Sequence, residues 1–100
     1  MISTTYGHTW ITFENGYTVS IFNGFGSYSE NHFNHKLFEK YQQHINPLDD
    51  SCDSKTAEIA ITYKDLGFCT STFIETNDSV IGYVSPEELV DILVKVKEAK

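Results

Sequence analysis

The sequence predicts an α+β domain: an antiparallel sheet of four to five strands, built from two hairpins, with a C-terminal amphipathic helix and a second helix packed on one face. Two stretches alternate between apolar and polar residues on either side of a turn signal. The chain ends in a capped segment whose apolar residues recur at helical spacing. With 100 residues, we expect a single compact domain spanning 1–100.

Residues 9–22 predict the first hairpin. A two-residue turn would place the apolar side chains of its first strand on the same face as the polar side chains of its second. A three-residue loop, 14–16, instead pairs Ile11 with Val19. We therefore expect a bulged hairpin in which Gly16 takes the left-handed conformation. The wetter face would carry four side chains: Trp10, Thr12, Thr18 and Ser20.

Residues 56–74 predict a second hairpin, because apolar and polar side chains alternate along its first strand up to the turn at 64–67. The partner strand, 68–74, is rich in threonine and fits more than one register. Residues 80–84 predict a fifth strand.

The C-terminal helix has the clearest local signal, since Ser85, Pro86 and Glu88 form a capping box with proline at the first helical position. Its apolar stripe consists of Leu89, Ile92, Leu93 and Val96. A second helix is predicted over residues 31–45, with Pro47 stopping it. The apolar stripe of that helix would be Phe33, Leu37, Tyr41 and Ile45.

The charge balance excludes some classes of partner. The chain has a formal net charge of −7, and all seven of its basic residues are lysine. Recognition of nucleic acid depends on a basic face and on the bidentate fork of arginine, so we expect no direct nucleic-acid binding. A basic partner suits this composition better.

No apolar run approaches the ~20 residues that span a bilayer, and the start of the chain lacks the features of a signal peptide. We therefore expect a protein of the cytoplasm without membrane contacts. In such a compartment Cys52 and Cys69 would be free thiols.

The segment 23–31 holds two glycines, two aromatic residues and several small polar residues between a strand and a helix. Glycines let backbone amides turn toward an anion, and a helix N-terminus adds unpaired N–H groups. The alternative is a glycine-kinked connection whose aromatic rings cover the core. The candidate binding residues are Trp10, Gly24, Phe25, Gly26, Ser27, Tyr28, Ser29 and Asn31.

Metal and catalytic chemistry are not predicted. The histidines are His8, His32, His35 and His44, and only the pair 32 and 35 shares a helical face. Two ligands do not close a zinc site, so we expect no metal and no cofactor. No nucleophile lies beside a base in the sequence, which favours a binding protein over an enzyme.

Acidic residues gather near the second hairpin, at Asp49, Asp50, Asp53, Glu58, Glu75 and Asp78. They could meet a basic protein or imitate a polyanion, or they could simply keep a small domain soluble, since such domains carry a net charge of about 2 to 8.

Three stretches, taken in order, resemble small proteins encoded by tailed bacteriophages: residues 11–20 with the loop that follows, residues 57–61, and residues 82–89. The segment 33–45 departs from that pattern, because the phage proteins are shorter there. The family has no assigned biochemical activity. The resemblance therefore implies a setting, the cytoplasm of an infected bacterium, and not a mechanism.

Three functions fit that setting. The first is an inhibitor that docks onto a host bacterial protein, such as a component of antiviral defence, with Trp10, Phe25 and Tyr28 as anchors. The second is a protein that sequesters a nucleotide-like small molecule in the glycine-rich loop. The third is a structural or assembly accessory of the phage. A homodimer formed through an open sheet edge is compatible with each.

Overall fold

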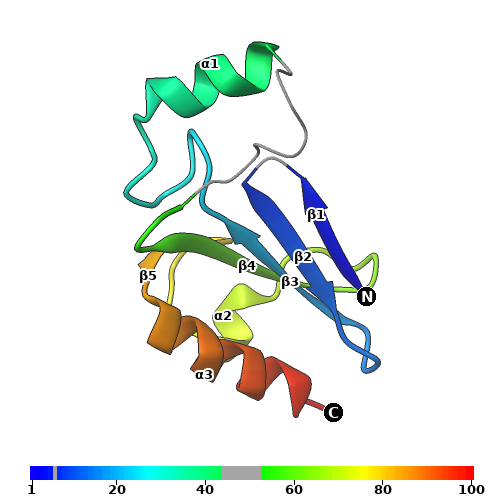
Figure 1. Cartoon of the computed structure of the whole chain (residues 1–100). Helices are drawn as coiled ribbons and strands as arrows, with labels where there is room; N and C mark the ends of the chain where they lie inside the picture. The colour runs from blue at the N-terminus through cyan, green and yellow to red at the C-terminus, as the bar shows by residue number, and fades with distance from the viewer. Residues whose placement is uncertain (6, 44–52) are drawn as a thin grey trace.

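The computed structural model describes residues 1–5, 7–43 and 53–100 and confirms the α+β class (Figure 1). Five antiparallel strands form one sheet in the order β1-β2-β3-β4-β5, so each strand pairs with its neighbour in sequence. Helices α2 and α3 lie together beside the sheet, whereas α1 lies beyond its end. The strands are β1 (Ile2–Thr5), β2 (His8–Thr12), β3 (Tyr17–Phe22), β4 (Ala57–Tyr63) and β5 (Ile81–Val84). The helices are α1 (His35–Gln43), α2 (Thr70–Phe73) and α3 (Pro86–Lys97).

The first hairpin has the predicted register, with Ile11 opposite Val19. The three-residue loop is closed by Gly16, whose amide donates to the Phe13 carbonyl at 3.0 Å. Gly16 has a φ of +93°, in the left-handed region where glycine avoids the clash of a Cβ atom. The apolar face of the hairpin therefore turns toward the core, as the loop length requires.

Strand β1 was not predicted, because its four residues are all exposed and have no apolar alternation. Backbone bonds join it to β2: the Met1 amine donates to the Thr12 carbonyl at 2.8 Å, and the Thr12 amide returns a bond of the same length to the Met1 carbonyl. Ladder bonds of this kind leave no trace in side-chain periodicity.

The prediction of a second hairpin is confirmed for its first strand and wrong for its second. Strand β4 forms as expected, but residues 68–74 make only an isolated bridge and then the short helix α2. Buried Thr70 is the reason: its Oγ1 accepts from the Ile61 amide at 2.9 Å and donates to the Ser79 carbonyl at 2.7 Å. The side chain thereby takes the place of a ladder bond, and β5 becomes the partner of β4.

Helix α3 confirms the capping box. The Ser85 hydroxyl accepts from the Glu88 amide at 3.2 Å, and the Glu88 carboxylate accepts from the Ser85 amide. Ile92 and Val96 on its apolar stripe are buried. They join a core in which Val96 is as fully enclosed as three side chains of β3 and β4: Val19, Ile59 and Ile61.

The second helix differs from its prediction. α1 begins at His35, four residues later than predicted, because residues 31–34 form turns that belong to the preceding loop. It does not pack on the sheet face with α3 (Figure 1). Phe33, predicted on its apolar stripe, is 78% exposed. The predicted end at Ile45 and the stop at Pro47 lie outside the described residues.

A side chain in the turn of the first hairpin also caps the C-terminal end of α3. The Asn15 side-chain amide donates to the carbonyls of Val96 at 2.8 Å and Ala99 at 2.9 Å, at the C-terminal end of the helix where carbonyls lack helical partners. The Asn15 Oδ1 atom accepts from the Tyr17 amide at 3.2 Å. One side chain thus connects the first hairpin to the last helix.

We expect Asn15→Asp to lower the free energy of unfolding by about 1–2 kcal/mol, measured by chemical denaturation. The variant keeps the acceptor for Tyr17 but loses the donors and places a negative charge at the negative end of the helix dipole. Glu14→Gln, at the exposed neighbouring position, is the control and should change stability by less than about 0.5 kcal/mol. Equal effects of the two variants would contradict this role of Asn15.

Candidate functional site

Hydrogen bonds between its own residues hold the glycine-rich loop, 23–31, that follows β3. The Ser27 hydroxyl lies 2.6 Å from the Gly24 carbonyl and 2.6 Å from the Ser29 hydroxyl. Both serines are buried, at 0% and 2% exposure, and the backbone of Gly24 is buried with them. These hydroxyls therefore hold the loop together instead of facing solvent.

Asn31 joins the start of the same loop to one distant segment of the chain. Its side-chain amide donates to the Asn23 carbonyl at 2.8 Å and to the Asp53 carbonyl at 2.9 Å, and the residue is 5% exposed. A ring nitrogen of His32 lies 3.0 Å from the Ser27 carbonyl. Among the described residues, no buried side-chain nitrogen or oxygen lacks a hydrogen-bond partner. The polar side chains predicted to bind an anion are thus engaged by other groups of the protein.

Phe25 and Gly26 have different surroundings. The Phe25 ring packs against Phe38 of α1, with the ring centroids 4.9 Å apart, and is partly buried. It therefore anchors α1 to the loop. Gly26 is exposed, with a φ of +85°, and its amide donates to the His32 carbonyl at 3.1 Å.

Tyr28 is held by its backbone and exposes its ring. Its carbonyl accepts from the Tyr83 amide at 2.8 Å, and its amide donates to the Glu58 carboxylate at 3.2 Å. The ring is stacked on His32, with centroids 5.5 Å apart, and the residue is 50% exposed. Of the predicted binding residues, Tyr28 is the one whose position best fits a recognition role.

The contact between Tyr28 and β5 depends on Gly82. A Cβ atom at position 82 would lie 2.7 Å from the Tyr28 Cβ and 3.1 Å from its carbonyl oxygen, which is closer than packed atoms approach. Glycine is therefore required here for close approach, and not for an unusual φ angle.

Tyr83 occupies a bulge. Between the pair of Ala57 with Val84 and the pair of Ile59 with Ile81, one residue of β4 lies opposite two residues of β5, so β5 carries one extra residue. Tyr83 has a φ of +54° and is 60% exposed. The left-handed region is unfavourable for a bulky L-residue, so the surrounding bonds must hold this tyrosine in place.

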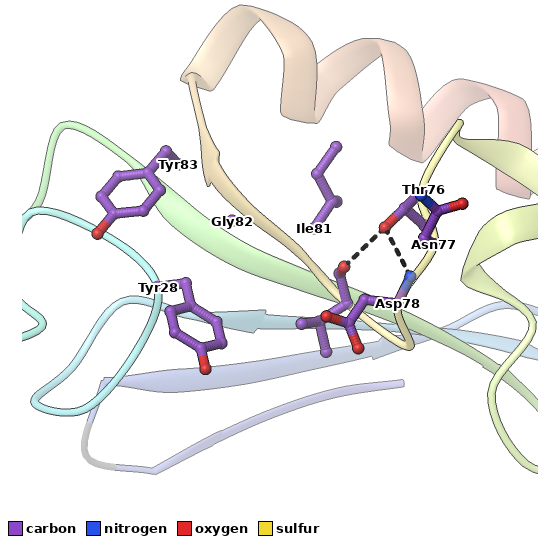
Figure 2. A pocket seen from close by; sticks show the side chains of 8 residues that line it. Tyr28, Thr76, Asn77, Asp78, Ile81, Gly82 and Tyr83 are labelled. Carbon is purple, nitrogen blue, oxygen red and sulfur yellow. Dashed lines mark hydrogen bonds between the residues drawn. The ribbon is translucent and has the colours of Figure 1, made fainter.

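An open groove of about 330 Å³ lies beside the two tyrosines (Figure 2). On its other side is the loop 76–78, where the Thr76 hydroxyl donates to the Val80 carbonyl and accepts from the Asp78 amide, each at 3.1 Å. Asp78 is exposed, and its carboxylate also accepts from the Ser79 amide. We call Tyr28, Gly82, Tyr83 and Asp78, with the groove between them, the tyrosine groove.

Sequence reasoning names Tyr28 as a binding residue and Asp78 as part of an acidic surface that could meet a basic protein. It assigns residues 82 and 83 to a strand and to a stretch that resembles phage proteins, but to no site. Neither the bulge nor the positive φ angle of Tyr83 leaves a sequence signal, because tyrosine rarely takes that conformation. The remaining signal was the neighbouring Gly-Tyr pair at the end of an apolar strand.

Trp10, the last predicted binding residue, belongs to a stack of rings on the sheet with His8 and Phe22. Its ring is 3.8 Å from the His8 ring, which also stacks on Phe22 at 5.0 Å. A His8 ring nitrogen bonds the Ser20 hydroxyl of β3. Burial in this stack lowers the pKa of His8 below its usual value of 6.5.

Within residues 1–5, 7–43 and 53–100, no group of three histidine, cysteine or acidic side chains is arranged to hold a metal ion. Cys69 is a free thiol, and burial raises its pKa. His44, Cys52, Asp49 and Asp50 lie outside the described residues. No helix in the described part of the chain is long and apolar enough to cross a membrane.

Comparison with known proteins returned no match, whether to family models, to curated proteins or to solved structures.

We expect Gly82→Ala to displace the Tyr28 segment, because the new methyl group would overlap the Tyr28 Cβ and carbonyl. Native-state hydrogen exchange at the Tyr83 amide should become faster, and the free energy of unfolding should fall by about 1–3 kcal/mol. Ser79→Ala, an exposed position in the same stretch, is the control. Unchanged Tyr83 exchange in Gly82→Ala would contradict the close contact.

The lowered pKa of His8 predicts a pH effect on stability. The unfolded chain takes up a proton at His8 near pH 6.5, before the folded chain does. The stabilising contribution is therefore present above that pH and is lost as the pH falls from there through the lower pKa of the folded chain. His8→Gln should reduce the acid loss of stability in denaturation curves between about pH 7 and 5. His35→Gln, at an exposed position, is the control and should leave the wild-type pH profile. Identical profiles for both variants would contradict the role of His8.

Proposed function

We propose that this is a binding protein that blocks or diverts a basic partner protein by docking through the tyrosine groove. The observation that carries the proposal is Tyr83, a bulky residue kept at a φ of +54° with 60% of its surface exposed. Backbone strain concentrates where a side chain must be aimed for function.

The strain at Tyr83 is not needed to fill the core. A left-handed conformation costs an L-residue roughly 1–2 kcal/mol, and glycine at the same place would avoid that cost. The Tyr83 ring is largely in solvent, so its packing offsets little of that free-energy cost. Recognition of a partner is a reason for keeping tyrosine at this position.

Tyr28 strengthens the proposal because its backbone is already immobilised on both sides, by Tyr83 and by Glu58. A side chain on an ordered backbone loses less conformational entropy on binding than one on a free loop. Tyrosine is also among the residues that contribute most to binding energy at protein interfaces. Two ordered, half-exposed tyrosines beside a groove make a suitable anchor.

Charge indicates the chemistry of the partner. The chain has a net charge of −7. Asp78 lines the tyrosine groove, and the Glu58 carboxylate accepts a hydrogen bond from the Tyr28 amide beside it. A lysine or arginine of the partner could lie against a tyrosine ring as a cation–π contact and face a carboxylate at the same time. Such a surface attracts basic partners and repels polyanions.

The alternative of a nucleotide-sequestering loop has less support. That function needs amides and hydroxyls free to meet phosphate, and those of Ser27, Ser29 and Asn31 are engaged within the protein. A phage assembly accessory has no specific feature in its favour. Docking to a protein is therefore the function that the geometry favours.

The biological setting belongs to the same proposal. A host bacterial protein, such as a component of antiviral defence, is the expected target, and the cytoplasm of the infected cell is the place of encounter. This part is based on the resemblance of residues 11–20, 57–61 and 82–89 to phage proteins.

The experiment is affinity capture from bacterial lysate with the wild-type chain and two variants. Tyr28→Ala and Tyr83→Gly should each weaken capture of the same basic protein at least tenfold, since loss of an anchor costs more than about 1.4 kcal/mol. Tyr83→Gly should leave the free energy of unfolding unchanged or raise it by up to about 1 kcal/mol, because it relieves strain.

Phe68→Ala is the matched control. Phe68 is a 62% exposed aromatic residue outside the tyrosine groove, so its loss should not affect capture. Binding should also weaken as salt is added, because the partner is basic. The proposal fails if the tyrosine variants capture the partner as well as Phe68→Ala does, or if the captured component is a nucleotide-like molecule seen by native mass spectrometry.

A further inference from the structure

We propose that a second copy of this chain pairs with β1, so that two sheets join through their β1 edges into one antiparallel sheet of ten strands. The first observation is charge: residues 1–13 contain no lysine, aspartate or glutamate, although 21% of the chain is charged. Sheet edges that remain single are usually protected by charged side chains, proline or a bulge. None of these three devices protects β1, and only its short length of four residues limits pairing at this edge.

The backbone of β1 presents regular hydrogen-bonding groups on its outer side. Met1 and Thr12 exchange both of their backbone bonds, which fixes the alternation along the strand. Ser3, opposite Trp10, therefore bonds inward to β2, whereas Ile2 and Thr4 point their N–H and C=O groups outward. No residue in the described part of the chain bonds that outer side.

The opposite edge of the sheet is closed. On β5 the Tyr83 amide already donates to the Tyr28 carbonyl, and the loop lies directly against Gly82. A protein with one open edge pairs into a closed dimer, whereas two open edges would allow continued addition of copies. The asymmetry between β1 and β5 thus favours a pair over a fibre.

A second copy fits this edge better than an unrelated strand does, because two antiparallel copies of one strand are related by a two-fold axis. With the axis at Ser3, Ile2 of one copy lies opposite Thr4 of the other, and the two such pairs exchange four backbone hydrogen bonds. Each copy has a net charge of −7, and the two copies repel each other. Their contact should therefore lie where charged side chains are absent. Ile2, 71% exposed in the single chain, becomes covered.

This pairing is independent of the proposed function. The tyrosine groove lies on β5, at the other end of the strand order, and stays open in the pair. A dimer would then present two such grooves, which would raise avidity for a partner with repeated sites. The four-residue strand makes a small interface, so association should be reversible and depend on concentration.

The test is the mass in solution, measured by analytical ultracentrifugation over a wide concentration range. The wild-type chain should rise from 11.4 kDa to twice that mass as concentration increases. Ser3→Asp, which places two carboxylates opposite each other at the axis, should abolish the rise. Ser71→Asp adds the same charge at an exposed position on α2 and should leave the dimer intact.

Two further variants test the geometry. Thr4→Pro removes an outward N–H that bonds none of the described residues of its own chain, and should also give a monomer. If this variant fails to fold, Ser3→Asp decides. Ser3→Cys should form an intermolecular disulfide on mild oxidation, because the two residues face each other as a close non-hydrogen-bonded pair, whereas Ser71→Cys should not.

A wild-type chain that stays at 11.4 kDa at every concentration overturns the proposal. A dimer that survives Ser3→Asp, or that Ser71→Asp weakens equally, overturns it as well, since the contact would then lie elsewhere. Capture of a partner through the tyrosine groove is measured separately, so failure of one proposal leaves the other open to its own test.

Discussion

The packing of α3 along the centre of the sheet is the interaction on which the rest of the structure depends. The buried side chains of α3, Ile92 and Val96, share one core with Val19 of β3 and with β4, and Asn15 secures the end of the helix to the first hairpin. A helix about 10 Å wide covers roughly two strands spaced about 4.8 Å apart. One long helix therefore cannot cover five strands, and β1 remains exposed at the margin.

The far margin of the sheet is organised differently, because a loop takes the place of a further strand. Gly82 allows Tyr28 to approach, the Tyr83 amide bonds its carbonyl, and the extra residue of the bulge turns Tyr83 outward. A restraint on the backbone thus determines where two exposed rings lie. The two margins of one sheet suit different contacts: an aromatic groove at β5 and a backbone edge without charged side chains at β1.

The loop 23–31 shows how far composition can predict a site. Glycine, serine and asparagine suit a loop that holds an anion, and they suit equally a loop whose hydroxyls and amides bond one another. The residues predicted as ligands, Ser27, Ser29 and Asn31, are buried in such internal bonds, while Tyr28 is exposed. Which polar groups face inward depends on residues far along the chain, such as Asp53, and local composition does not contain that information.

The sequence by itself determined the elements whose stabilising contacts are local. The capping box at Ser85 and the three-residue loop ending in Gly16 are formed by neighbouring residues, so their patterns could be recognised without the fold. Tertiary structure alone decided that residues 68–74 would not form a strand, that β1 would join the sheet, and that Tyr83 would be strained and exposed. Each of these outcomes depends on backbone hydrogen bonds or close contacts between distant segments, which side-chain periodicity does not record.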